Sequence, residues 1–243
     1  AVQPNYKELL PGLPIRRLAK ISKMALTCAM QLSESIDWSA IIMGTGLGNL
    51  IDTEKFIRTY SLSKGGLIPP TSFTQSGHNT IAGFIALQLK NHGYNMTHVQ
   101  REFSFENALL DAMLQLEFGA SEVLIGAADE NMPLLPQWLN EMNFSTDLID
   151  QLGEGAAFYH LSNRPSKIAV CSLSFNKEVV NMADALQEFC DRENLEKQKY
   201  SFIVKPQVRY PGKKEQQHTL FILDPSGNPL EFKSYSGTNE DFI

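Results

Sequence analysis

The chain has 243 residues, of which 43% are hydrophobic, 20% charged and 9% aromatic. This is the composition of a globular protein, and it argues against disorder, collagen-like repeats and a coiled coil. The net charge of −6 disfavours nucleic-acid binding, because an acidic surface repels phosphate backbones. No apolar run reaches the roughly 18 residues of a membrane span, so we expect none.

The first half of the chain alternates predicted helices with predicted strands. Apolar residues at helical spacing predict an amphipathic helix over 15–35. The apolar run 39–43 predicts a buried strand ending at Gly44, and after the turn GTGLGN a helix is expected with Asp52 or Thr53 as its N-cap. Further on we expect helices over 79–91 and 105–117 and strands over 121–130 and 153–162. This order predicts an α/β fold, a sheet with helices packed on it.

The sequence pattern changes near Pro165. After that residue the sequence predicts a βαβββ unit. Its parts are a strand over 167–175, a helix over 176–194 and strands over 200–204, 218–223 and 229–235. We therefore predict two domains, residues 1–165 and residues 166–243.

The three cysteines show no sign of disulfide or metal chemistry. Cys28, Cys171 and Cys190 cannot all pair with one another, and none has a CxxC or Cys/His metal spacing. We expect reduced, partly buried thiols, as is typical of a cytoplasmic protein. The residues after Ala1 show no basic-then-apolar leader, which agrees with that expectation.

Five segments of the first predicted domain together resemble the ketosynthase branch of the thiolase superfamily. They are IRRLAKISKMAL (15–26), IIMGTGLGN (41–49), PTSFTQSGHNTIAGFIALQLK (70–90), ENALLDAMLQLEFGASEVLIGAADE (106–130) and GEGAAFYHLS (153–162). Each is weak alone, but their order is that of the family. The resemblance implies a thiolase-like layered half-fold that serves fatty-acid, polyketide or aryl-polyene biosynthesis. It also implies an acyl-carrier-protein partner and a dimer, with a ketosynthase partner or with a second copy.

A condensing ketosynthase needs a cysteine thiolate at a helix amino end, where backbone N–H groups lower the thiol pKa. Aligning TSFTQSGHNT with the family motif places Gln75, or else Ser76, at that position. A Gln there resembles the chain-length-factor subunits, which shape the acyl pocket without forming the acyl thioester. The resemblance implies a non-condensing role for this chain too, with Phe73, Asn79 and Phe105 against the acyl chain. If the chain is an enzyme, the resemblance implies an acyltransferase of the β-ketoacyl synthase type.

Two other roles remain open for the same segment. Ser76 and His78 would form a hydrolytic pair, although two residues on one helix start aim poorly at each other. Alternatively, Gln75, Ser76 and Asn79 cap the helix and hold its turn. We expect His92 to be exposed in a turn and His160 to be structural. The histidines that match no catalytic motif of the family are His92, His98 and His160.

The tail carries a second resemblance. Residues 204–237, and DPSGNPLEFK within them, are similar to the end of a vicinal-oxygen-chelate module of the glyoxalase and dioxygenase superfamily. Glu231 matches that family's metal-binding carboxylate. The expected first-strand His is replaced by Lys167 or Ile168, and His218 lies on a different strand. Since a lone Glu does not hold a catalytic metal, we expect no cofactor, with a divalent metal at Glu231 as the alternative.

The sequence thus favours a ketosynthase-like, chain-length-factor-like subunit that binds acyl chains and an acyl carrier protein. The alternatives are a metal-dependent lyase or dioxygenase organised by the tail, and a non-catalytic scaffold protein. Residues 185–204 also resemble the start of a ketosynthase's second half, so the domain boundary could lie near 205 instead. The basic side chains that offer either a docking surface for the carrier protein or a plain solvated helix face are Arg16, Arg17, Lys20 and Lys23.

Overall fold

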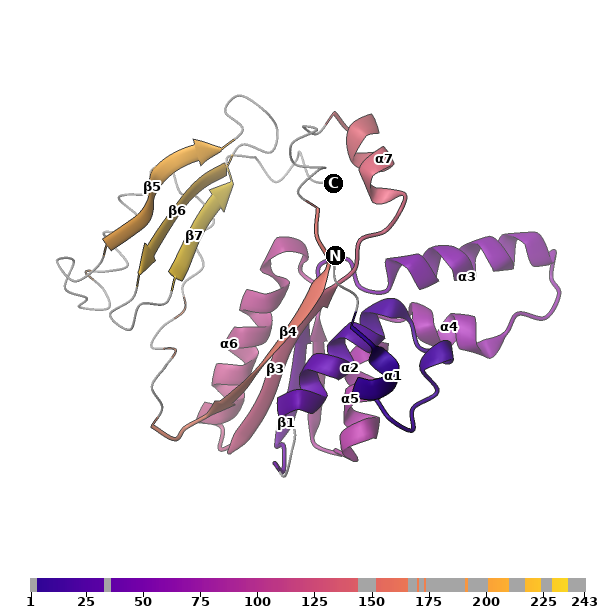
Figure 1. The fold of residues 1–243 in the computed structure, drawn as a ribbon, viewed down its shortest axis with the longest axis horizontal. Helices are drawn as coiled ribbons and strands as arrows, with labels where there is room; N and C mark the ends of the chain where they lie inside the picture. The colour runs from indigo at the N-terminus through magenta and orange to yellow at the C-terminus, as the bar shows by residue number, and fades with distance from the viewer. Residues whose placement is uncertain are drawn as a thin grey trace. The chain divides into compact units, whose positions relative to one another are not determined.

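The computed structural model describes residues 4–32, 36–143 and 152–165, three single positions after them, and the backbone of three later strands (Figure 1). The chain forms two compact units, residues 1–133 with 152–164 and residues 134–151 with 165–243. The elements in chain order are α1 (Tyr6–Leu9), η1 (Ile15–Arg17), α2 (Lys20–Leu32), β1 (Ala40–Gly44), α3 (Leu50–Ser63), α4 (Pro70–Ser76), α5 (Thr80–Leu89), β2 (Tyr94–His98), η2 (Arg101–Phe103), α6 (Ser104–Glu117), β3 (Glu122–Asp129), α7 (Leu135–Glu141), β4 (Gly155–Ser162), β5 (Ser201–Arg209), β6 (Gln217–Leu223) and β7 (Pro229–Tyr235).

The first unit is built on a four-stranded sheet with the strand order β2-β1-β3-β4. β1 runs parallel to both β2 and β3, whereas β4 runs antiparallel to β3. The sheet confirms the expected α/β class and the strands expected over 39–43, 121–130 and 153–162. β2 was not expected from the sequence.

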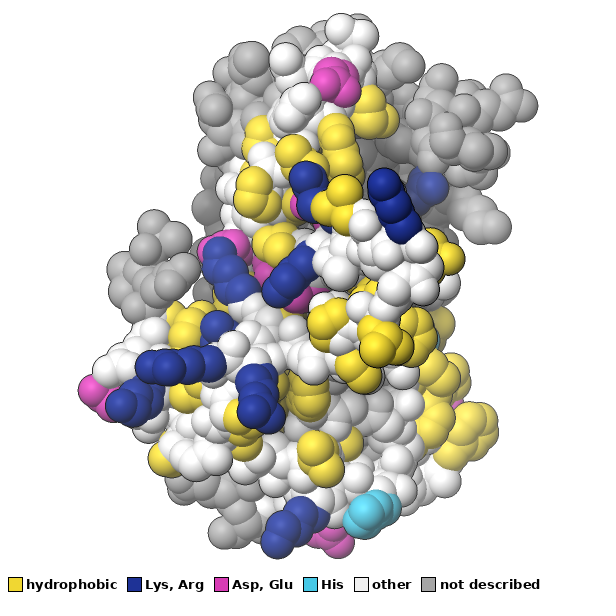
Figure 2. Space-filling model, turned by 90° about the vertical axis from the view of Figure 1, so that its right-hand side faces the viewer, with side chains coloured by type: hydrophobic (Ala, Val, Ile, Leu, Met, Phe, Trp, Pro, Cys, Tyr) yellow, Lys and Arg dark blue, Asp and Glu magenta, His cyan; other side chains and the backbone are white. Residues whose placement is uncertain are grey.

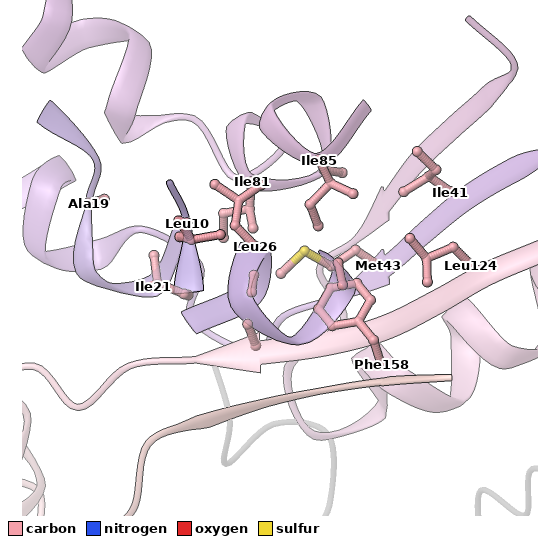
Figure 3. Packing of buried hydrophobic residues seen from close by; sticks show 14 of the residues in the cluster. Leu10, Ala19, Ile21, Leu26, Ile41, Met43, Ile81, Ile85, Leu124 and Phe158 are labelled. Atoms are coloured by element: carbon pink, nitrogen blue, oxygen red, sulfur yellow. The ribbon is translucent and has the colours of Figure 1, made fainter. Parts of the chain in front are cut away.

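Helices cover both faces of this sheet, because successive residues of the central strand point to opposite sides. Ile41 and Met43 of β1 join a core with α2 and α5 (Figure 3). Ala40 and Ile42 join a second core with α6. Burial of a large apolar side chain contributes about 1.5–3 kcal/mol, so these two cores fix the three layers of the unit.

Two helices of the first unit begin at other residues than expected. α2 starts at Lys20, after the extended residue Leu18, because its cap is supplied by the distant carboxylate of Glu130, which accepts the N–H of Ile21. α3 starts at Leu50, and its N-cap position is held by Asn49 in place of Asp52 or Thr53. Both differences arise from contacts that the local sequence does not display.

The second unit contains α7 and an antiparallel sheet with the order β5-β6-β7. These strands confirm the three that were expected over 200–204, 218–223 and 229–235, and β5 extends further than expected, to Arg209. The strand expected over 167–175 and the helix expected over 176–194 lie almost wholly outside the described residues. Within the described parts of the chain, no helix has the length and hydropathy needed to cross a membrane.

Candidate functional site

The three parallel strands β2, β1 and β3 end at the same edge of the first sheet. In open α/β sheets, ligands bind in the crevice outside the carboxyl ends of the strands. The segments that follow these strands are the loop 45–49 after β1, the turn 99–103 after β2 and residues 130–133 after β3. These segments and the helices that follow them therefore form the candidate site.

The loop after β1 is held by one carboxylate. Oδ1 of Asp129 accepts hydrogen bonds from the Thr45 hydroxyl (2.9 Å) and from the backbone N–H of Gly46 (2.9 Å) and Leu47 (3.2 Å). The Thr45 hydroxyl oxygen in turn accepts the N–H of Gly48 at 2.8 Å. Hydrogen bonds to a charged group are stronger than those between neutral groups, so Asp129 holds this loop in place at the sheet edge.

A sharp turn joins β2 to α6 at the same edge. Arg101 has a φ of +54°, a left-handed conformation that is uncommon for residues other than glycine. The Ser104 hydroxyl donates to the Arg101 carbonyl (2.6 Å) and accepts the N–H of Gln100 (2.9 Å). A Cβ on Gly44 would lie 2.6 Å from the Ser104 carbonyl oxygen. The absence of a side chain at Gly44 therefore leaves room for the start of α6.

This turn has the form in which several enzyme families present a nucleophile, a strained strand-to-helix turn with the reactive residue at the helix amino end. The residues at that place are Arg101, Glu102 and Phe103, and none of them is a cysteine. This turn was not expected from the sequence, because β2 was not expected. The one sequence signal for it was the strand-length segment 94–98 ahead of the predicted helix over 105–117.

Gln75 lies in a different setting from the one expected. It occupies the carboxyl end of the short helix α4, and the extended residue Gly77 separates α4 from α5. The expectation that Gln75 opens the helix over 79–91 is therefore wrong. The residue is nonetheless buried, its side chain donates to the Arg17 carbonyl, and its own carbonyl accepts the Asn49 side chain at 2.7 Å.

The neighbours of Gln75 make local contacts. The Ser76 hydroxyl donates to the Phe73 carbonyl at 2.8 Å, and no hydrogen bond described for the chain joins Ser76 to His78. His78 packs so closely on Gly48 that a Cβ there would collide with its ring. Asn79 holds the N-cap position of α5, as the capping hypothesis expected, but its side chain makes no capping hydrogen bond.

The two phenylalanines expected against the acyl chain have different surroundings. Phe73 is 66% exposed, and its ring centroid lies 5.6 Å from that of Phe56 on α3. Phe105 lies 5.9 Å from Tyr159 of β4 and packs against the α6 core. The acyl-binding roles of Phe73, Asn79 and Phe105 and the catalytic roles of Gln75, Ser76 and His78 therefore stay predictions.

A buried carboxyl group follows β3 at the same edge. Glu130 is 4% exposed, and its Oε2 accepts the N–H of Ile21 at 3.2 Å. Burial, with the charge of Asp52 as the second cause, raises the pKa of Glu130 to about 7. Beside it, Lys20 donates to Glu154 at 2.6 Å, and this bond holds the pKa of Glu154 below its usual value.

Two histidines, His98 and His160, form hydrogen bonds with carboxylates. His98 shares a hydrogen bond of 2.9 Å with Asp111, which also accepts the Tyr94 hydroxyl at 3.1 Å. His160 is hydrogen-bonded to Glu122 and stacks edge-on against Trp38, in line with its expected structural role. His92 is exposed, as expected.

No group of three or more His, Cys, Asp or Glu residues within the described parts of the chain has the geometry of a metal site. The side chain of Glu231 lies outside those parts, so the divalent metal expected there as an alternative stays a prediction. Cys28 is described, and its thiol donates to the Ala156 carbonyl at 3.4 Å. Burial raises the pKa of the Cys28 thiol, so this cysteine is a poor nucleophile.

The model of the beta-ketoacyl synthase N-terminal domain matches residues 2–192. The chain belongs to the beta-ketoacyl synthase family. This confirms the resemblance to the ketosynthase branch and the thiolase-like layering of sheet and helices. The matched residues extend beyond 165, and the domain boundary at 165, or near 205, stays a prediction. A search of the curated proteins found no match.

Solved structures of this fold are similar to the chain. One is a ketosynthase in complex with its chain length factor from Xenorhabdus doucetiae, with 20% identity and a TM-score of 0.52 over 65% of this chain and 69% of that one. Another is the ishigamide ketosynthase/chain length factor, with 20% identity and a TM-score of 0.57 over 65% and 48%. A third is a type II polyketide-synthase acyl-carrier protein in complex with its ketosynthase, with 17% identity and a TM-score of 0.55 over 67% and 51%.

At these identities the likeness shows the fold, and the chain spans about half the length of the second and third structures. A glyoxalase/bleomycin resistance protein/dioxygenase from Alicyclobacillus acidocaldarius also matches, with 23% identity over 37% of this chain. Its TM-score of 0.21 is too low to carry an argument. The assignment of the tail to the vicinal-oxygen-chelate superfamily therefore stays a prediction.

Proposed function

We propose that the chain is a non-condensing, chain-length-factor-like subunit that binds an acyl chain and an acyl carrier protein beside a ketosynthase partner. The observation that carries this proposal is the composition of the two helix amino ends at the carboxyl edge of the sheet. α5 begins with Asn79 and Thr80, and α6 follows Arg101, Glu102 and Phe103. Condensation requires a thiolate nucleophile at such a position, and neither helix offers a cysteine.

Cys28, the cysteine within the described residues, does not supply the missing nucleophile. Cys28 lies within α2 and is held as a thiol by burial. Cys171 and Cys190 lie outside the described residues. In this proposal the chain is the subunit that shapes and holds the acyl chain. The ketosynthase partner forms the carbon–carbon bond.

A partner surface is available on β2 and α6. β2 is an edge strand of its sheet, and edge strands offer unpaired backbone groups to another chain. Leu110 and Leu114 of α6 and its C-cap residue Phe118 follow one another at a spacing of four residues, and Phe118 is 82% exposed. Exposed apolar side chains beside an open strand edge support a paired subunit, either a ketosynthase or a second copy.

A basic surface supports binding of the acidic carrier protein. Figure 2 shows several Lys and Arg side chains spread over one face, with Asp and Glu side chains beside some of them. Lys23 of α2 and Lys55 of α3 both act as positive charges on Asp52. Arg16 and Arg17 of η1, which precedes α2, are exposed and add two further positive charges. On a chain of net charge −6, a basic surface of this kind attracts acidic partners.

The test is covalent labelling with a radiolabelled acyl thioester, followed by mapping of the labelled residue. We expect no stable label on the wild-type protein. Glu102→Cys is expected to take the label, because position 102 lies at the amino end of α6. Gln75→Cys is the matched comparison, and labelling there alone would favour the alignment from sequence. A stable label on wild-type protein, at Ser76 or at a cysteine, would overturn the non-condensing role.

A further inference from the structure

Glu130 is an unusual residue for the end of a strand. Only 4% of it is exposed, and its Oε2 accepts the N–H of Ile21, the second residue of α2. This is the contact of an N-cap, supplied from a distant part of the chain. Oε1 of Glu130 is buried and has no hydrogen-bond partner among the described residues. A buried carboxyl group with an unpartnered oxygen is costly as an anion and tolerable as an acid.

The charges around Glu130 also oppose its ionisation. Asp52, near the amino end of α3, and Glu154, just before β4, both act on it as negative charges. The N–H of Ile21 and the charge of Lys20 act in the opposite direction, and Lys20 is engaged by Glu154. The charged or titratable groups that face this cluster from the packed elements are Tyr6 of α1, Lys20, Lys23 and Cys28 of α2, Asp52 and Lys55 of α3, Asp129 of β3, and Glu154.

We propose that Glu130 is a proton-controlled positioning residue, which when neutral caps the amino end of α2 and lets the amino end of α3, with Asp52, lie beside the end of β3, and which when ionised repels Asp52 and loosens both helix ends. Loosening follows because the anion is repelled by Asp52 and Glu154 and draws water to its unpartnered oxygen. The pKa of Glu130, raised to about 7 by burial and by Asp52, places this change near neutral pH. Burial also raises the pKa of Asp52, whereas Lys55 and Lys23 lower it.

The segments that precede the helix capped by Glu130 and the helix that carries Asp52 are the two anchors of α4. Arg17, just before α2, accepts the side chain of Gln75. Asn49, just before α3, donates to the carbonyls of Gln75 (2.7 Å) and Gly77 (3.1 Å). A movement of either helix end therefore displaces α4. That this displacement affects acyl binding rests on the proposed function, whereas the proton-controlled movement itself does not.

The experiment is amide hydrogen exchange of the full chain between pH 5.5 and pH 8.5, corrected for the intrinsic pH dependence of exchange. In the wild-type protein, the peptides that cover 18–24 and 48–56 are expected to exchange at least tenfold faster at pH 8.5 than at pH 5.5. Glu130→Gln keeps an acceptor for Ile21 but cannot ionise, so its exchange is expected to be independent of pH. Glu117→Gln, on the exposed end of α6, is the control and should behave as wild type.

A second variant keeps the proposal testable if Glu130→Gln does not fold. Asp52→Asn removes the negative charge that raises the pKa of Glu130, so the midpoint of the exchange change should move to lower pH. Wild-type exchange that does not change with pH, a tenfold change that persists in Glu130→Gln, or an unmoved midpoint in Asp52→Asn would each overturn the proposal. No acyl ligand is needed, so failure here is distinct from failure of the labelling experiment.

Discussion

The side chain of Gln75 donates a hydrogen bond to the backbone carbonyl of Arg17, and this bond ties the end of α4 to the segment before α2. The Asn49 side chain donates to the carbonyl of the same glutamine at 2.7 Å. Gln75 is therefore held from two sides, by residues that precede two different helices. Its amide is used for structure, and a substitution there must be judged first by stability.

Gln75→Ala is expected to lower the free energy of unfolding by about 1–2 kcal/mol. The variant leaves the Arg17 carbonyl without its donor, and an unsatisfied buried polar group costs about that much. Urea unfolding followed by circular dichroism measures the change. The control is Ser76→Ala, whose hydroxyl bonds only to Phe73 in its own helix turn and should cost under about 0.5 kcal/mol. Equal losses in the two variants would contradict the assigned role.

Two glycines should respond to alanine in opposite directions. At Gly44 the new Cβ would lie 2.6 Å from the Ser104 backbone oxygen, and such overpacking typically costs about 1–3 kcal/mol. At Gly83, inside α5, the new Cβ meets nothing within 4 Å, and alanine is favoured in a helix by about 1 kcal/mol. Thermal unfolding should therefore show a lower Tm for Gly44→Ala and a higher Tm for Gly83→Ala. A raised Tm for Gly44→Ala would refute the close approach of α6.

The layers of the first unit could be predicted from sequence because they follow from periodicity. The run 40–43 is apolar at every position, as a strand covered on both faces must be, and α5 lies within the expected helix. β2 could not be predicted in the same way. Its sequence YNMTH is largely polar, since it is an edge strand whose first three residues are exposed. An edge strand has one neighbour and therefore shows little hydrophobic pattern.

The turn at Arg101 was missed for the same physical reason. Without β2, the sequence before α6 indicated only a helix start, and the family motif was aligned with the preceding helix. The extended backbone of Gly77 that ends α4 and the left-handed φ of Arg101 are backbone properties that residue types indicate only weakly. The role of Glu130 was also hidden from sequence, because its cap on Ile21 spans 109 positions.

Asp129 is expected to be essential for the stability of the loop after β1. Asp129→Ala removes the acceptor of three hydrogen bonds, from Thr45, Gly46 and Leu47, and a single hydrogen bond to a charged group contributes about 1.5–3 kcal/mol. We expect a loss of at least about 2 kcal/mol in urea unfolding. Asp37→Ala, at an exposed position, is the control and should change little. A near-neutral Asp129→Ala would mean that the loop does not depend on this carboxylate.

The basic surface should govern affinity for an acyl carrier protein if the proposed function holds. The double variant Arg16→Glu with Arg17→Glu is expected to raise the Kd at least tenfold, mainly through slower association, and to weaken the salt dependence of binding. Fluorescence anisotropy with a labelled carrier protein measures both. The double variant Lys64→Glu with Lys90→Glu, at the exposed ends of α3 and α5, makes the same change in net charge and tests whether net charge alone explains the effect. Equal losses for both variants would assign attraction to net charge and leave this surface as a plain solvated face.

Glu130 should also make stability depend on pH in a defined direction. Its pKa is raised from 4.5 to about 7 in the folded chain, so the folded state binds more protons than the unfolded state between these values. The contribution of the group is therefore fully present below pH 4.5 and is lost as the pH rises to about 7. At 1.36 kcal/mol for each pH unit, the loss is at most about 3 kcal/mol.

Glu130→Gln removes this loss, because the amide stays neutral at every pH. Relative to wild type, the variant is expected to be similar in stability near pH 4.5 and more stable by up to about 3 kcal/mol at pH 8. Urea unfolding of both proteins at pH 5, 6, 7 and 8 gives the difference directly. Glu154→Gln is the control, with an expected change in stability of the opposite sign. Lys20 lowers the pKa of Glu154, so the charged form of Glu154 is the stabilising one and the variant should be less stable than wild type. A difference between Glu130→Gln and wild type that does not grow with pH would show that Glu130 is ionised without cost.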